Sequence, residues 1–311
     1  MKSSLRSKRC VKKIVQGVAE GTGFQAIARR AIHPRYPLRF LLYHSISDTW
    51  EDDLSVPVEI FKDQMAFLAD HYHVISLQEA CRQIASGGPF SERTAVITFD
   101  DGYKDNFHRA YPILEKFRLP ATIFLLIGGI GTEKRWPPDA GDPQGPLDHE
   151  LLDWEEVRQM QRGGFVTFGN HTMSHALFSD LSPQQAREEI SASKRRLEEE
   201  LGEGSYAFTY PFGTALEVTD PVKRLVRESG FYCACTAMIG GNGKGSDLFA
   251  LRRTPIEWSD GMDLFRKKLE GALDFLALKD SRFGQTLKGW IGPFFGIHTF
   301  RQRKKKFTVE T

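Results

Sequence analysis

Residues 95–102 read AVITFDDG, a run that changes abruptly from an apolar segment to charged turn residues. Its first five residues, Ala95 to Phe99, are β-branched, aromatic or small, which predicts a buried strand. Two carboxylates and a glycine follow, and the pattern of residues 103–117 (YKDNFHRAYPILEKF) predicts a helix. A buried strand that leads directly into a helix is typical of a parallel β/α unit.

The same order of strand and helix recurs along most of the chain. We expect strands at residues 39–46, 73–77, 95–100, 120–128, 165–171, 206–213 and 248–257, and helices at 56–73, 78–85, 103–117, 154–164, 182–202 and 219–230. At least six such units predict parallel strands, and this number favours a closed or nearly closed β/α barrel over an open sheet. The strand C-termini are then the place for chemistry. Residues 136–150 predict a long surface loop.

Composition excludes several classes of protein. A chain of 311 residues that is 41% hydrophobic and 26% charged is globular, not disordered or collagen-like. Its four cysteines are sparse, and the pair Cys233 and Cys235 fits neither a zinc ribbon nor a thioredoxin motif, so we expect a reducing compartment. The longest apolar runs, at 121–127 and 290–297, are shorter than the roughly 20 residues of a membrane span. We also expect no secretory signal peptide and a cytoplasmic location.

Charge is distributed unevenly along the chain. Residues 1–39 contain ten Lys or Arg and one Glu, and residues 281–311 contain seven and one, so ends of +9 and +6 flank a body of −13. Trp290 and Phe294 precede the cluster RQRKKK, and aromatic residues beside cations suit an anionic membrane surface. We therefore expect a domain at 38–280 between a basic N-terminal extension (1–37) and a basic C-terminal tail (281–311) that contact the inner membrane face. Solvated tails are the alternative. No nucleic-acid partner is expected.

Two short patterns contain candidate metal ligands. Asp100 and Asp101 are adjacent at a strand end, so their side chains point to different sides, and one can bind a cation while the other acts as a base. Turn chemistry alone is the alternative. His171 and His175 are four residues apart, which predicts that both imidazoles lie on one side of a helical turn. One carboxylate and two imidazoles leave a coordination position open for water, as a hydrolytic metal site requires.

Three motifs resemble those of a known family. TFDDG at 98–102 and HTMSH at 171–175, in this order, are similar to the first two motifs of the polysaccharide deacetylases with a NodB-homology domain, carbohydrate esterase family 4. YPFG at 210–213 resembles the third motif, and the resemblance covers residues 38–258. It implies a distorted (β/α)7 barrel and a metal-dependent hydrolase of non-peptide amide bonds, which removes N-acetyl groups from amino sugars.

The resemblance also implies roles for single residues. Asp101, His171 and His175 match the metal ligands of the family, and Asp100 matches its general base. The ion is expected to be zinc, although this donor set also accepts cobalt, nickel or iron. The backbone N–H of Phe212 matches the donor that the family uses to stabilise the oxyanion.

The sequence departs from the family pattern in two places. Thr209 stands where the family often has an Arg that orients the base, and Arg252 or Arg253 is a candidate replacement from a neighbouring strand end. The late catalytic histidine of the family is also absent, because the only late histidine is His298 in the basic tail.

An early histidine is the candidate for that missing role. LLYHSI at 41–46 resembles the opening of the subgroup that acts on exopolysaccharides similar to poly-N-acetylglucosamine, in which an early histidine is the general acid. This resemblance implies that His44 is the acid. Because the first strand of a closed barrel neighbours the last, His44 can reach the space that a late motif usually serves.

The expected substrate is an N-acetylated glycan: a polysaccharide, an oligosaccharide or a lipid-linked precursor, with acetyl and formyl groups both left open. We expect it to contact Tyr210, Pro211, Arg253 and Trp258. One alternative is a barrel that binds carbohydrate without turnover, and another is a basic-tailed adaptor at a membrane surface. GGNGKG at 240–245 lacks the spacing of a phosphate-binding loop, and no G-x-S-x-G motif occurs, which excludes nucleotide-binding and serine hydrolase functions.

Overall fold

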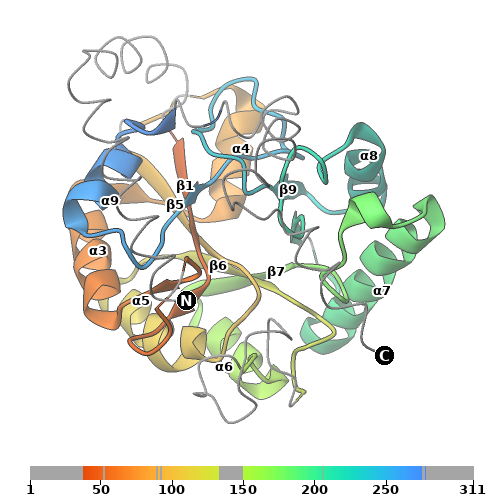
Figure 1. The fold of residues 1–311 in the computed structure, drawn as a ribbon, viewed down its shortest axis with the longest axis horizontal. Helices are drawn as coiled ribbons and strands as arrows, with labels where there is room; N and C mark the ends of the chain where they lie inside the picture. Colours follow the sequence, from red (N-terminus) through yellow and green to blue (C-terminus); the bar gives the residue numbers. More distant parts are fainter. Residues whose placement is uncertain are drawn as a thin grey trace, which may run out of the picture.

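A curled parallel sheet forms the centre of the molecule (Figure 1). The computed structural model describes residues 38–51, 53–88, 90–91, 93–132, 150–204, 206–274 and 277. The main sheet consists of β1 (Leu38–Tyr43), β4 (His73–Val74), β5 (Thr94–Phe99), β6 (Ala121–Leu125), β7 (Val166–Asn170), β8 (Ala207–Thr209), β9 (Cys233–Cys235) and β10 (Thr254–Pro255). The strand order is β10-β1-β5-β6-β7-β8-β9, with β4 beside β5, and these pairings are parallel. β2 (Ser45–Ile46) and β3 (Ser55–Val56) form a separate parallel pair.

Helices surround this sheet. They are α3 (Val58–His71), α4 (Leu77–Ser86), α5 (Tyr111–Phe117), α6 (Trp154–Gly163), α7 (Pro183–Leu201), α8 (Asp220–Glu228) and α9 (Met262–Leu269), with a π-helix at Asn106–Ala110 and a 3-10 turn at Phe178–Asp180. Figure 1 shows α3, α5, α6, α7 and α8 around the strands, with α9 beside α3. Local sequence sets the helix ends: α7, for example, starts at a capping box formed by Ser182 and Gln185.

The strands are apolar on both faces, as expected where helices cover a parallel sheet. On one face, Leu41 and Tyr43 of β1 belong to a large cluster with the buried residues of α3, α5, α6, α7 and α8. On the other face, Phe40 and Phe124 form a second cluster with α4, which buries Ile84 there. The sheet therefore holds two apolar layers and leaves its polar chemistry to the strand ends.

Residues 242–255 close the sheet between β9 and β1. The backbone N–H of Leu251 donates to the carbonyl of Ala234 in β9, and the Leu251 carbonyl accepts the N–H of Thr236, the residue after β9. The next strand, β10, pairs with β1. Asn242 pairs with Leu38, while its side chain bonds to the backbone N–H and C=O of Arg252. The architecture is the distorted β/α barrel that the sequence predicts, and the glycine-rich stretch around Asn242 is part of its closure.

Several elements differ from the sequence-based expectation. The helix expected at 103–117 is divided into the π-helix and α5, and the strand expected at 248–257 shortens to the two residues of β10. The strand β9 and the helix α9 were not expected. A three-residue Cys-Ala-Cys strand is too short to show periodicity, and it is identified by its pairing with β8 instead.

The two basic ends and most of one loop lie outside the described residues. These are the N-terminal extension (1–37), the C-terminal tail (281–311) with His298, and the surface loop 136–150 except Glu150. The domain boundaries drawn from the sequence therefore stay predictions. Among the described helices, none combines the length and apolar character that a bilayer crossing requires.

Candidate active site

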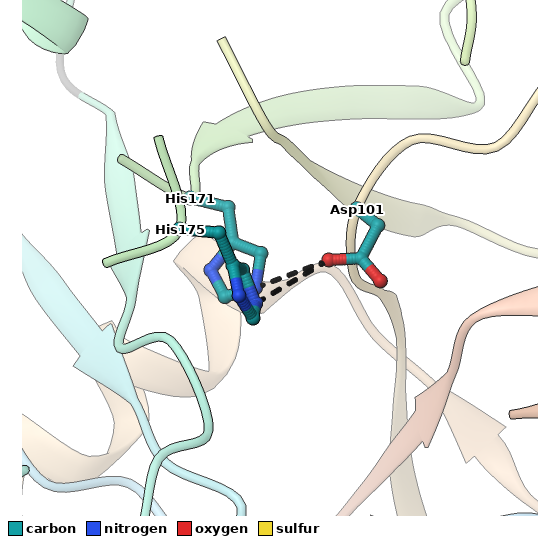
Figure 2. A group of neighbouring side chains, drawn as sticks. All are labelled: Asp101, His171 and His175. Carbon is teal, nitrogen blue, oxygen red and sulfur yellow. Dashed lines mark ion pairs between the residues drawn. The ribbon is translucent and has the colours of Figure 1, made fainter. Parts of the chain in front are cut away.

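Three side chains from two strand ends meet at one point. Asp101 follows β5, and His171 and His175 follow β7 (Figure 2). The Nε2 atoms of His171 and His175 lie 3.3 and 3.7 Å from Oδ1 of Asp101. Donor atoms that bind one ion at about 2.1 Å with tetrahedral angles are roughly 3.4 Å apart. The three side chains therefore have the spacing of a metal site.

Hydrogen bonding prepares the same three groups for a cation. Nδ1 of His171 lies 3.0 Å from the carbonyl oxygen of Thr209, and because a carbonyl only accepts, this nitrogen carries the proton. The Nε2 lone pair of His171 is then free to face Asp101. Oδ1 of Asp101 is buried and accepts no hydrogen bond from the described residues, which is costly unless a cation is bound there.

The pKa shifts of His175 and Asp101 favour the charge states of metal ligands. Burial lowers the pKa of His175 to about 3, so its imidazole is neutral. Burial by itself raises the pKa of Asp101. The two histidines lower this pKa by more, so the net shift is downward. A neutral imidazole and an ionised carboxylate are the forms that bind a divalent ion.

The two histidines lie on an irregular loop, so the predicted helical turn is wrong. Thr172 and His175 have φ values of 67° and 57°, in the left-handed region that side chains other than glycine seldom adopt. Glu189 of α7 holds this loop, because its carboxylate accepts the backbone N–H groups of Met173 and Ser174 at 3.1 and 3.0 Å. The loop conformation, and not helix geometry, brings the imidazoles together.

A second contact from α7 supports the same loop. Oδ1 of Asn170 accepts the N–H of Thr172 at 2.9 Å and the hydroxyl of Ser193 at 3.0 Å. Ser193 and Glu189 are four residues apart and so share one face of α7. Neither residue is a candidate from the sequence, because a contact between α7 and this loop leaves no local pattern.

Asp100 is held by Arg253, the residue directly before β10. Nη1 and Nη2 of Arg253 donate to Oδ1 and Oδ2 of Asp100, each at 2.7 Å. The remaining donors bond to three threonines: Nη1 to Oγ1 of Thr98, Nη2 to Oγ1 of Thr209, and Nε to the carbonyl of Thr236. Arg253 is 0% exposed. Its donors are used within the protein, and the expected contact of Arg253 with substrate stays a prediction.

The structure places Arg253, and not Arg252, in the role of the missing motif-three arginine. Nη1 of Arg252 instead donates to the carbonyl of Ile239 at 2.9 Å. Burial raises the pKa of Asp100, but the charge and hydrogen bonds of Arg253 outweigh it and bring that pKa below its ordinary value. Asp100 is therefore an ionised carboxylate in a fixed orientation.

Thr209 contributes through both of its oxygen atoms. Its carbonyl accepts from His171, and its hydroxyl accepts from Arg253 at 2.8 Å. The short side chain leaves space for the Arg253 guanidinium, which an arginine at position 209 would occupy.

The rest of the third motif has a mixed outcome. Tyr210 and Pro211 are buried, and the Tyr210 hydroxyl donates to the carbonyl of Phe249, while the expected contact of these two side chains with substrate stays a prediction. Phe212 and Gly213 form a left-handed turn, and a Cβ on Gly213 would lie 2.3 Å from a backbone nitrogen. The Phe212 ring lies 4.7 Å from that of His175.

His44 reaches the same edge of the sheet from β1. Tyr43 is in register with Phe99, so His44 and Asp100 each follow one member of a strand pair. The charges of Asp101, Asp100 and Arg253 all act on His44. Burial, together with the charges of Arg253 and His171, lowers its pKa against the opposing effect of the two carboxylates. Trp258, by contrast, lies half-buried in the turn before α9, and no hydrogen bond or ring contact joins it to the other described site residues.

We predict that Asp101→Ala, His171→Ala and His175→Ala each abolish stoichiometric binding of a divalent metal, because a three-ligand site rarely keeps its ion after losing one ligand. Elemental analysis of the purified variants measures this. His73→Ala is the matched control, since His73 is exposed at the start of β4 and should leave the metal content unchanged. A ligand variant that retains one ion per chain would contradict the assignment.

We predict that Glu189→Gln weakens metal affinity by about 10- to 100-fold, the usual effect of altering a group that orients the ligands. The backbone N–H groups of Met173 and Ser174 donate to Oε2 of Glu189 and the Ser174 hydroxyl donates to Oε1, and a glutamine amide keeps only one of these two acceptor oxygens. Competition with a chelator gives the affinity. Glu188→Gln, on the exposed neighbouring position, is the control, and equal affinities for both variants would show that Glu189 does not orient the loop.

Comparison with known proteins agrees with this site. Residues 87–234 match the polysaccharide deacetylase family. The chain is 30% identical over 226 residues to "Putative polysaccharide deacetylase YxkH" of Bacillus subtilis (strain 168). The aligned region covers 72% of this chain and 72% of that protein. It is 25% identical over 226 residues to the poly-beta-1,6-N-acetyl-D-glucosamine N-deacetylase of Staphylococcus epidermidis, covering 70% of this chain and 73% of that protein.

The fold has a close counterpart among solved structures. The deacetylase PplD of Streptococcus pyogenes, solved in complex with acetate, superimposes with a TM-score of 0.64 at 22% identity, over 76% of this chain and 99% of that one. That identity supports the likeness of the fold alone. With the sequence match over the first three motifs and the shared barrel, the chain belongs to the polysaccharide deacetylase family.

Proposed function

We propose that this protein hydrolyses the acetamide of N-acetylglucosamine units in a polysaccharide, an oligosaccharide or a lipid-linked glycan. The observation that carries the proposal is an ionised Asp100, clamped by Arg253, beside the Asp101, His171 and His175 group. The name of the Staphylococcus epidermidis relative supports this class of substrate. Release of acetate from N-acetylglucosamine oligomers, with appearance of free amine, tests it.

The resident cofactor is proposed to be one divalent ion held by Asp101, His171 and His175. The family is metal-dependent, and two imidazole nitrogens with one carboxylate oxygen fit zinc, while cobalt, nickel and iron accept the same donors. When bound, such an ion activates water and polarises the acetamide carbonyl. Elemental analysis of protein purified without added metal identifies it.

Asp100 is proposed as the general base. Its carboxylate is ionised because of Arg253, so it can accept a proton from the attacking water. The bidentate pair fixes both oxygens, which keeps the accepting lone pair in one direction during the reaction. Arg253 thereby orients the base.

His44 and Phe212 complete the proposed catalytic groups. His44 lies in the field of Asp100 and Asp101, and donates a proton to the amine as the carbon–nitrogen bond breaks. The backbone N–H of Phe212, on its left-handed turn beside His175, donates to the oxyanion. Asp100 and His44 thus serve opposite sides of the reaction, one taking a proton and the other giving one.

The alternative of a barrel that binds carbohydrate without turnover has less support. It was motivated by Thr209 and by the absence of a late histidine, but Arg253 fills the space beside Thr209 and His44 lies near the ligand group. A binding protein has little use for a buried arginine clamped on an ionised carboxylate. Location at the cytoplasmic membrane face stays a prediction from the charge of the two ends.

We predict that Asp100→Asn keeps the metal but lowers kcat by about 10²- to 10⁴-fold, the range for loss of a general base. The amide cannot accept the proton, while the ligands are unchanged. Acetate release and elemental analysis on the same sample separate the two effects, and a melting curve monitors the loss of the ion pair with Arg253. Near-normal turnover would remove Asp100 from the role of base.

We predict that His44→Ala lowers kcat by about 10²-fold or more and removes the decline of the rate at alkaline pH. The acid must carry its proton, so the rate falls as the pH rises through the pKa of His44, which burial places below its ordinary value. The pH profile of kcat for the two proteins measures this. A variant with the wild-type profile would assign the proton donor to another group.

A further inference from the structure

The segment that carries His44 is tied to the loop that carries Asp100 and Asp101. Nδ2 of Asn106 donates to the carbonyl oxygen of His44 at 2.8 Å. The same nitrogen donates to Oδ1 of Asp105 at 2.9 Å. One amide group therefore bonds at once to the backbone of His44 and to the carboxylate next to it in the chain.

Asp105 holds the two residues after His44. Its Oδ2 accepts the hydroxyl of Ser45 at 2.5 Å, and its Oδ1 accepts the backbone N–H of Ile46 at 3.0 Å. Arg109 adds a bond from Nη1 to the carbonyl of Ile46 at 3.2 Å. Residues 44–46 are thus fixed by side chains at both backbone and side-chain atoms.

The bonds of Asp105 to Ser45, Ile46 and Asn106 are buried, and the bond from Asn106 to the carbonyl of His44 is partly buried. Asn106 and Ser45 are each 0% exposed, and Asp105 is 4% exposed. Hydrogen bonds in such surroundings are not exchanged for water, and breaking one leaves a buried polar group unsatisfied. Residues 44–46 therefore have little freedom to move relative to β5.

The π-helix explains how these side chains reach the segment. Asp105 and Asn106 come four and five residues after Asp101, and the helix starts there with π geometry before it continues as α5. Single π turns within helices recur at functional sites.

We propose that Asp105 and Asn106 are positioning residues that hold His44 at a fixed place relative to Asp100 and Asp101. This inference rests on the proposed role of His44 as general acid. It adds that the acid, the base and one metal ligand belong to one hydrogen-bonded unit, built from β1, β5 and the π-helix. The acid is then aligned by its backbone, and its imidazole remains available to the substrate.

A double-mutant cycle between Asn106→Ala and His44→Ala tests the proposal, with kcat, KM and metal content measured for all four proteins. Asn106→Ala alone should lower kcat by up to about 10²-fold, as small displacements of catalytic groups do, with metal content and KM unchanged. In the His44→Ala background the same change should alter kcat by no more than about twofold, the scatter between independent sites. A loss of stability alone would not make the effect of Asn106→Ala on kcat depend on the presence of His44.

Two further variants keep the test decisive. Asp274→Asn is the control for stability. Asp274 forms a buried bidentate pair with Arg39 near the N-terminal end of β1, whereas the site lies at the carboxyl ends of the strands. It should lower the melting temperature without changing kcat. If Asn106→Ala does not fold, Ser45→Ala removes one donor to Asp105 and should reproduce the coupled loss of kcat in weaker form.

The outcomes separate this inference from the proposed function. Independent effects of Asn106→Ala and His44→Ala, with His44→Ala impaired, overturn the positioning role and leave the acid in place. An unimpaired His44→Ala variant overturns both the acid and its clamp, and this is visible from the single variant. Coupled effects, with metal retained, support the proposal.

Discussion

The buried pair between Arg253 and Asp100 is the interaction on which the site depends. It joins the closing segment of the barrel to β5, and the guanidinium also bonds to threonines on three separate segments. Removing one member of such a pair leaves an uncompensated buried charge, at a cost of about 3–5 kcal/mol. The barrel is therefore closed by the same contact that orients Asp100, the proposed base.

The residues around that pair are held in conformations that cost energy. Asp101, Thr172, His175 and Phe212 all have positive φ values, and each lies in or beside the ligand group. Such strain persists only where surrounding bonds enforce it. Here Glu189 and Asn170 hold the histidine loop, and Glu217 bonds to Ser179 across the loops that follow the second and third motifs.

The sequence predicted the alternation of elements and the ligand group because both leave local patterns: apolar runs, and Asp or His at strand ends. It could not choose between Arg252 and Arg253, because adjacent residues differ only in the face to which they point. It assigned Tyr210 to substrate, although a tyrosine in a motif can equally be a core residue with a bonded hydroxyl. The spacing of His171 and His175 also favoured a helical turn, which the structure does not have. The contacts from α7 that shape this loop leave no local pattern in the sequence.

The measurement that tests this account most directly is the pH dependence of kcat/KM for Arg253→Lys, with metal content determined in parallel. Lysine keeps the charge but cannot form the bidentate pair, so the pKa of Asp100 should rise toward its ordinary value or above it. Because the base must be ionised, the acidic limb of the profile should move to higher pH and kcat should fall, while the metal remains bound. An unshifted acidic limb with wild-type kcat would contradict the claim that Arg253 sets the state of the base.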